Sequence, residues 1–287
     1  MFSKSDLVSI FFPVFSHWII WVAFLVVSGG ALFLYAYPYI RTPRKEFLRR
    51  HIGIPIVSVA SLYTFTKLLE GVIYNGAILK VDVWINESVV GLRTPFMNKL
   101  AFFITSFGGG YLIVVIVIVT IGILFLMKRW RFALLSLTAI IGATLLQVLI
   151  KALVNRPRPP NMLKTISDGS FSASFPSGHA ITAIVYVSLL IYSYRDDIKH
   201  VGTKYLLITL ASAFFITVGL TRIYLGVHWF SDVLAGMTLG LFWFMTVVLV
   251  ERSITGLVKA VRIETKEAAE DPALPKIIPK IEKALKK

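Results

Sequence analysis

Long apolar stretches separated by short polar segments set the pattern of hydrophobic and polar positions along this chain. A helix needs about 20 mostly apolar residues to cross a bilayer, and these stretches reach that length without the alternation of barrel strands. The pattern predicts spanning helices at residues 16–37, 54–78, 101–127, 133–153, 177–194, 204–221 and 229–250. We therefore expect an all-α fold, a polytopic transmembrane helical bundle.

Polar segments divide this pattern into three parts. Residues 1–52 are expected to contain an N-terminal transmembrane helix, too long for a cleavable signal, and a basic cytoplasmic linker. Residues 53–250 carry the other six spans. Residues 251–287 are polar, basic and interrupted by proline, which predicts a partly disordered cytoplasmic tail. Attraction of that tail to anionic lipids is the alternative.

The composition agrees with a membrane protein. A hydrophobic fraction of 56%, a charged fraction of 16% and a mean hydropathy of +0.77 exclude an ordinary soluble domain. The chain has no cysteine, so disulfides and thiolate metal sites are excluded. The net charge of +15 would suit a nucleic-acid partner. Lys and Arg also accumulate in the cytoplasmic loops of membrane proteins, and this interpretation fits the apolar pattern better, so no nucleic-acid partner is expected.

The distribution of Lys and Arg predicts the orientation in a plasma membrane. Of the 30 Lys and Arg residues, 20 fall on the side of the linker, of the loops near residues 130 and 200, and of the tail, whereas nine fall on the opposite side. The more basic side is expected to be cytoplasmic, together with the C-terminus. An odd number of spans then places the N-terminus outside.

Three polar segments interrupt the second half of the chain at the ends of apolar stretches: residues 151–159, 176–179 and 222–232. All three are predicted on the extracytoplasmic side. Ionisable groups are costly at the edge of a bilayer, so such a cluster is a candidate functional site.

The third segment has the residues of an activated nucleophile. His228 and Asp232 are four residues apart at the start of the last span, so they share one helical face. A carboxylate there holds the imidazole in one tautomer and stabilises its protonated or phosphorylated form. We expect His228 to attack phosphorus and form a phosphohistidine, and His179 to serve as the acid and base.

Cations and helix amides complete the expected phosphate site. Lys151, Arg158 and Arg222 supply positive charge for the phosphoryl oxygens, and the amides of Ser177 and Gly178 open a helix, where donors are unsatisfied. Carboxylates with metal-ligand spacing do not accompany a histidine, so neither a metal nor another cofactor is expected.

Two further groups have less specific patterns. Lys67 and Glu70 lie three residues apart inside the second span, where they are expected to form a structural ion pair; a role in binding a polar headgroup is the alternative. The glycines at 108–110 lack the strand and Lys-Ser/Thr of a nucleotide-binding loop, and are expected to allow close helix packing or form a pocket wall. Asp82 and Glu87 are expected in an outer loop, where they could cap helices.

The pattern Lys-x6-Arg-Pro, Pro-Ser-Gly-His and Arg-x5-His-x3-Asp resembles the signature of the type 2 phosphatidic acid phosphatase superfamily of membrane lipid phosphatases. The resemblance covers about residues 80–250, including Asp82 and the stretch 105–110. It implies a six-helix core, a metal-independent phosphohistidine mechanism and a phosphorylated lipid substrate.

The resemblance also assigns roles to individual residues. It makes His228 the nucleophile, Asp232 its partner and His179 the acid and base. The phosphate ligands that it implies are Lys151, Arg158, Ser177, Gly178 and Arg222. Two features depart from the family pattern: Thr221 stands where Ser is usual, and the first span is extra to the six-helix core.

These observations predict an integral membrane lipid phosphatase acting at the outer leaflet. Candidate substrates are a polyprenyl diphosphate such as undecaprenyl diphosphate, phosphatidylglycerol phosphate and phosphatidic acid, of which the basic site slightly favours the diphosphate. One alternative is a transferase that passes the phosphoryl or headgroup to another lipid. The other is a non-catalytic phospholipid transporter that uses the cations only for binding.

Overall fold

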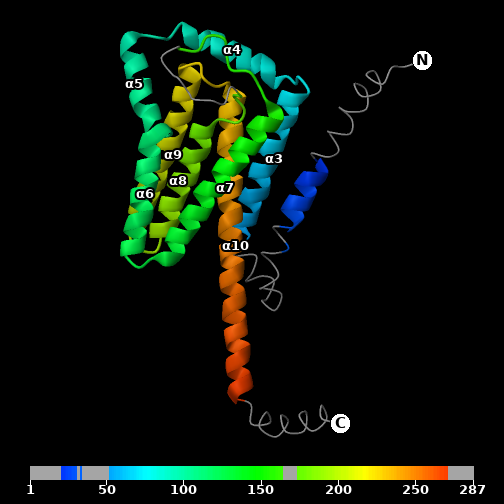
Figure 1. The fold of residues 1–287 in the computed structure, drawn as a ribbon, viewed down its shortest axis with the longest axis vertical. Helices are drawn as coiled ribbons and strands as arrows, with labels where there is room; N and C mark the ends of the chain where they lie inside the picture. The colour runs from blue at the N-terminus through cyan, green and yellow to red at the C-terminus, as the bar shows by residue number, and fades with distance from the viewer. Residues whose placement is uncertain (1–20, 31–32, 34–51, 164–172, 271–287) are drawn as a thin grey trace, which may run out of the picture.

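The computed structural model describes residues 21–30, 33, 52–163 and 173–270 (Figure 1). Within these ranges the chain forms helices joined by turns and loops, without a strand. The helices that run along the bundle are α3 (Gly53–Ile73), α5 (Pro95–Ser106), α6 (Gly110–Leu126), α7 (Trp130–Val154), α8 (Gly178–Tyr194), α9 (Val201–Tyr224) and α10 (Phe230–Glu270). Helix α4 (Ile78–Val90) instead lies across one end of the bundle (Figure 1).

The lengths of these helices suit a bilayer. Five helical stretches of the described chain are long and apolar enough to cross it: Gly53–Ile73, Pro95–Leu126, Trp130–Val154, Val201–Tyr224 and Phe230–Val258. Helix α8 is a largely apolar helix of 17 residues, about 26 Å long at the rise of an α-helix. The predicted transmembrane helical bundle is confirmed. Of the first predicted span, residues 21–30 form an apolar helix, and most of its other residues lie outside the described ones.

The observed boundaries differ from the predicted ones at three places. Helix α3 ends at Ile73, and Asn75 follows with φ +53°, a conformation that asparagine tolerates. The predicted span 101–127 is part of a longer helical stretch that is interrupted after Ser106 and resumes at Gly110. Helix α10 continues 20 residues beyond the predicted end at 250.

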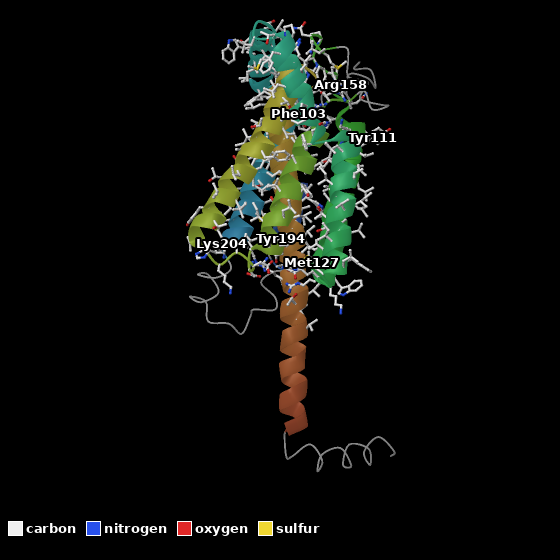
Figure 2. All side chains as sticks on the ribbon, turned by 90° about the vertical axis from the view of Figure 1, so that its left-hand side faces the viewer. Phe103, Tyr111, Met127, Arg158, Tyr194 and Lys204 are labelled. Atoms are coloured by element: carbon white, nitrogen blue, oxygen red, sulfur yellow. The ribbon has the colours of Figure 1, made fainter. Side chains whose placement is uncertain are left out.

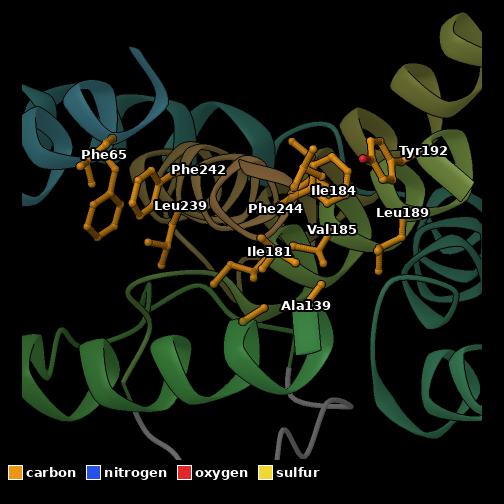
Figure 3. Close-up of a cluster of buried hydrophobic side chains, with 14 of the residues drawn as sticks. Phe65, Ala139, Ile181, Ile184, Val185, Leu189, Tyr192, Leu239, Phe242 and Phe244 are labelled. Atoms are coloured by element: carbon orange, nitrogen blue, oxygen red, sulfur yellow. The ribbon is translucent and has the colours of Figure 1, made fainter. Parts of the chain in front are cut away.

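Helices α8 and α10 form the centre of the bundle. Half of the α10 span is buried, against 22% of the α5–α6 span, whose side chains largely face outward. The core between α8 and α10 contains Ile181, Ile184 and Val185 from α8 and Leu239 and Phe242 from α10 (Figure 3). Because both helices begin next to the polar segments, this packing positions those segments relative to one another.

Ion pairs tie helices together outside this core. At the end of the bundle opposite the polar segments, Arg129 Nη1 lies 2.7 Å from Asp197 Oδ2, and Arg131 pairs with Glu251 of α10. In α3, Lys67 Nζ lies 2.6 Å from Glu70 Oε2, so the predicted pair forms. Lys67 Nζ also lies 5.3 Å from the centre of the Trp21 ring. This contact joins the helix at residues 21–30 to the bundle.

Candidate active site

The end of α7, the starts of α8 and α10 and the end of α9 meet at the end of the bundle covered by α4 (Figure 1). Arg158 lies at this end, far from Tyr194, Lys204 and Met127 (Figure 2). Asn155 ends α7 in the left-handed conformation, with φ 44°, so that the Pro-rich loop turns over the site. The structure therefore brings the three polar segments together.

His228 and Asp232 lie face to face at the start of α10. The distance between His228 Nδ1 and Asp232 Oδ2 is 3.5 Å, and both side chains are buried. The same carboxylate oxygen accepts a hydrogen bond of 2.9 Å from the amide of Trp229, the residue preceding α10. This contact caps the helix and fixes the carboxylate. Asp232 can therefore hold the His228 ring in one orientation with its Nε2 directed away from the carboxylate.

A buried arginine that the sequence analysis did not assign joins this pair to α4. Arg156 Nη1 donates to Asp232 Oδ1 and to Ser231 Oγ, each over 2.7 Å, and Nη2 donates to Asp82 Oδ2 over 2.7 Å. Its guanidinium also lies over the ring of Trp229, 5.2 Å from the ring centre. Two carboxylates thus share one cation, and each is buried.

Asp82 was expected in an outer loop, and this was wrong: it lies in α4 and is 1% exposed. The expected capping role is found, because Asp82 Oδ1 accepts a 2.8 Å hydrogen bond from the amide of Ser231 in the first turn of α10. Asp82 Oδ2 also accepts a 2.5 Å bond from Ser231 Oγ. Helix α4 thereby anchors the helix that carries Asp232.

Each of the three predicted phosphate cations donates a hydrogen bond to a neutral oxygen. Lys151 Nζ donates to the carbonyl of Ala173 over 2.9 Å, and Arg158 Nη1 donates to the carbonyl of Val227 over 3.1 Å. Arg222, 1% exposed, donates to Thr105 Oγ1 over 3.1 Å. Through the contact of Arg222 with Thr105, residues 105–110 become part of the site. Each of these cations is therefore held in place by a contact within the protein.

The start of α8 is tied to α10 through Ser177. Its amide donates to the carbonyl of Asp232 over 2.9 Å, and its hydroxyl is buried without a hydrogen-bond partner among the described residues. Gly178 opens the helix, and a β-carbon there would lie 2.4 Å from Gln147 Nε2. Ser177 and Gly178 thus provide a hydroxyl and helix-start amides suited to an anion.

Glycine 109 provides the wall behind His179. A β-carbon at Gly109 would lie 2.2 Å from His179 Nε2, so the backbone of this segment touches the imidazole directly. Gly109 and His179 line the same cavity of about 440 Å³ between α6, α7 and α8. The expected pocket wall is confirmed for Gly109 and Gly110, whereas Gly108 allows close packing against Val218 of α9.

A left-handed glycine turns the chain between Arg222 and His228. Gly226 has φ +69°, and a β-carbon there would lie 2.6 Å from Arg93 Nη2 and 2.8 Å from the carbonyl oxygen of Asn161. Arg93 donates to the carbonyls of Tyr224 and Asn161, over 3.0 and 2.7 Å, and its burial lowers the pKa of its guanidinium from the ordinary value. This contact closes the loops over the site.

The departure at Thr221 has a local explanation. Its hydroxyl donates to the carbonyl of Val218 over 2.6 Å, within α9, and the side chain is buried. The residue therefore satisfies its hydroxyl inside its own helix.

Among the described residues, no group of three His, Asp or Glu side chains is arranged to hold a metal ion.

Comparisons with known proteins agree with this geometry. Residues 132–254, which contain all three segments, match the model of the PAP2 superfamily. The chain is 33% identical over 189 residues to phosphatidylglycerophosphatase B of Bacillus subtilis, a match that covers 65% of this chain and 91% of that protein. The chain belongs to the PAP2 superfamily.

Further similarities to PAP2 and other lipid phosphatases extend this result. The crystal structure of a transmembrane PAP2-type phosphatidylglycerolphosphate phosphatase from Bacillus subtilis superposes with a TM-score of 0.58 at 29% identity, covering 67% of this chain and 94% of that one. A dihydrosphingosine 1-phosphate phosphatase of Schizosaccharomyces pombe is 34% identical over 90 residues, 30% of this chain and 22% of that protein. This PAP2 chain is therefore a multi-pass membrane protein of a phosphatase family.

Proposed function

We propose that this PAP2 protein hydrolyses the terminal phosphate of a phosphorylated lipid through a phosphohistidine formed on His228. The observation that carries the proposal is the buried His228–Asp232 pair, with a Nδ1–Oδ2 distance of 3.5 Å, set among three anchored cations. A protein that only bound phosphate would need the cations but not an aligned imidazole.

In the first step, His228 Nε2 forms a bond to phosphorus while the bond from phosphorus to the lipid oxygen breaks. His179 donates a proton to that oxygen, so the lipid leaves as an alcohol or, from a diphosphate, as a monophosphate. In the second step, His179 accepts a proton from water, and the water oxygen displaces the imidazole from phosphorus. Inorganic phosphate and free His228 are the products.

The other residues stabilise charge during both steps. Lys151, Arg158 and Arg222 neutralise the equatorial oxygens of the phosphoryl group, and the amides at the start of α8 donate to them. Asp232 stabilises the positive charge of the phosphorylated ring. Arg156 lies between Asp82 and Asp232 and holds the Asp232 carboxylate in place beside the ring.

Two features support a lipid as the substrate. The cavity beside His179 is lined further along by apolar residues of α6 and α7, which suits a hydrocarbon tail entering sideways from the bilayer. The relatives named above are phosphatases of lipid phosphates. The excess of Lys and Arg that the sequence predicts on the side of the loops near residues 130 and 200 supports an extracytoplasmic site.

Phosphate release tests the proposal. The purified wild type and His228→Ala are incubated in detergent with phosphatidic acid, phosphatidylglycerol phosphate and a polyprenyl diphosphate, with EDTA present. We expect release by the wild type and a loss on the order of 1,000-fold or more in His228→Ala. The matched control His200→Ala, at the opposite end of the bundle, should retain activity.

The rival functions predict other outcomes. A transferase would label histidine from a ³²P-lipid and pass the label to a second lipid without releasing phosphate. A binding protein would retain phosphate-lipid binding in His228→Ala and form no phosphohistidine in the wild type. Either result contradicts the proposal.

A further inference from the structure

The cavity beside His179 changes from polar to apolar along its length. Near the phosphate site it is lined by His179, Gln147 and Thr182. Away from the site it is lined by apolar side chains from α6 and α7, which include Ile113, Val117, Ile121, Leu137 and Ile140. A lipid whose phosphate lies among the cations would extend its tail along this cavity.

One face of α7 shows the same change from polar to apolar residues. Lys151, Gln147, Thr144, Ile140 and Leu137 are spaced by alternating steps of four and three residues, so they form a single stripe on the helix. The last four line the cavity. At the rise of an α-helix, Gln147 lies about 6 Å and Thr144 about 10 Å from the level of Lys151. The polar groups therefore lie directly below the phosphate site and above the apolar region.

Two of these polar side chains have no internal partner. Within the described part of the chain, neither the amide of Gln147 nor the hydroxyl of Thr182 makes a hydrogen bond, whereas Thr144 bonds to the carbonyl of its own helix at Ile140. Gln147 and Thr182 are partly buried on spanning helices, where an unsatisfied amide or hydroxyl is unfavourable. Both face the cavity, so a bound ligand is the natural partner for them.

We propose that Gln147 and Thr182 form a subsite that binds the ester-bearing glycerol region of a diacylglycerol phosphate and selects this lipid class over polyprenyl phosphates. The inference rests on the proposed function and identifies the substrate class of that site. In a diacylglycerol phosphate, ester carbonyls follow the phosphate within a few bonds and accept hydrogen bonds from the amide and hydroxyl. A polyprenyl chain offers only carbon there and leaves both groups unsatisfied.

A contact of Gln147 with the phosphate itself is the competing interpretation, because its amide lies against Gly178. The two interpretations differ in how substrates respond. A phosphate contact would serve every lipid phosphate equally. An ester contact serves only lipids that have esters. The phosphate already has three cations and the start of α8, so the ester contact is the role that these two side chains add.

The test compares three substrates that share a terminal phosphate: a diacylglycerol phosphate, its dialkyl ether analogue without carbonyls, and a polyprenyl phosphate. For the full-length wild type in detergent micelles, we expect kcat/KM to be about 10-fold or more higher for the diacyl lipid than for the ether lipid. Gln147→Leu should reduce kcat/KM for the diacyl lipid to about that of the ether lipid and leave the polyprenyl value within about threefold.

Thr182→Val provides a second variant that keeps the side-chain shape, and should reduce the same preference. Its matched control is Thr138→Val, on the exposed face of α7 away from the cavity, which should leave all three values unchanged. Melting temperatures separate loss of folding from loss of selection. Equal losses on all three substrates, or no preference in the wild type, would overturn the subsite. A wild type that releases no phosphate from any of them would overturn the proposed function itself.

Discussion

Single residues of this site differ in how much of their role the sequence reveals. His228 and Asp232 could be paired from their spacing, because a helix places residues four apart on one face. Arg156 could not, because its partners Asp82 and Asp232 lie 74 and 76 positions away along the chain. Gln147 was also missed, since one amide within an apolar stretch has no pattern of its own. The roles of Arg156 and Gln147 both depend on contacts between residues that lie far apart in the sequence.

Arg156 is expected to act as a positioning residue for Asp232. Arg156→Gln removes the cation shared by two buried carboxylates, so kcat should fall on the order of 100-fold with a smaller change in KM, and the melting temperature should fall. The measurement is a double-mutant cycle with Asp232→Asn. If Arg156 acts through Asp232, adding Arg156→Gln to Asp232→Asn should cost little more activity. Arg156→Lys should restore part of it. Fully additive losses would contradict the positioning role.

At the scale of elements, helix existence was predictable and helix interruptions were not. The long apolar stretches gave each spanning helix, since no other structure satisfies their backbone groups in lipid. The break after Ser106 was not expected, because its cause is tertiary: Gly109 passes so close to His179 that a side chain would not fit. The continuation of α10 beyond residue 250 was missed because the sequence pattern detects only the apolar part of a helix, which ends there. Contacts of Glu251 with Arg131 and Tyr192 hold the helix at this point.

The close contact between Gly109 and His179 at this break predicts the effect of a substitution. Gly109→Ala would place a β-carbon 2.2 Å from His179 Nε2, so the imidazole or the α5–α6 junction must shift. We expect kcat/KM to fall about 10-fold or more, since displaced catalytic groups are costly. Gly122→Ala in α6 is the matched control: nothing lies within 4 Å of its β-carbon, and activity should be unchanged. Equal activity in the two variants, measured as phosphate release, would show that His179 does not depend on this wall.

At the scale of the whole molecule, the candidate site and the inter-helix ion pairs lie at opposite ends of the bundle. The predicted phosphate cations lie at the end covered by α4, whereas the inter-helix ion pairs of Arg129 and Arg131 and the extension of α10 lie at the other end (Figure 1). The sequence predicted that the three polar segments would share one side, because alternate ends of successive spans face the same way. Which side of the membrane this is depends on the surrounding charge, and the sequence predicts the excess of Lys and Arg on the other side, with the loops near residues 130 and 200.

The absence of cysteine allows this orientation to be tested without background. Leu92 lies between α4 and α5 at the site end and is 66% exposed; Met127 lies at the opposite end, after α6, and is 54% exposed (Figure 2). In intact cells, a membrane-impermeant maleimide should label Leu92→Cys, and should label Met127→Cys only after the cells are permeabilised. The comparison of labelling before and after permeabilisation controls for differences in thiol reactivity. The reverse pattern would place the site on the cytoplasmic side, where the lipid phosphate would have to be drawn from the inner leaflet, and the positive-inside argument would be wrong for this protein.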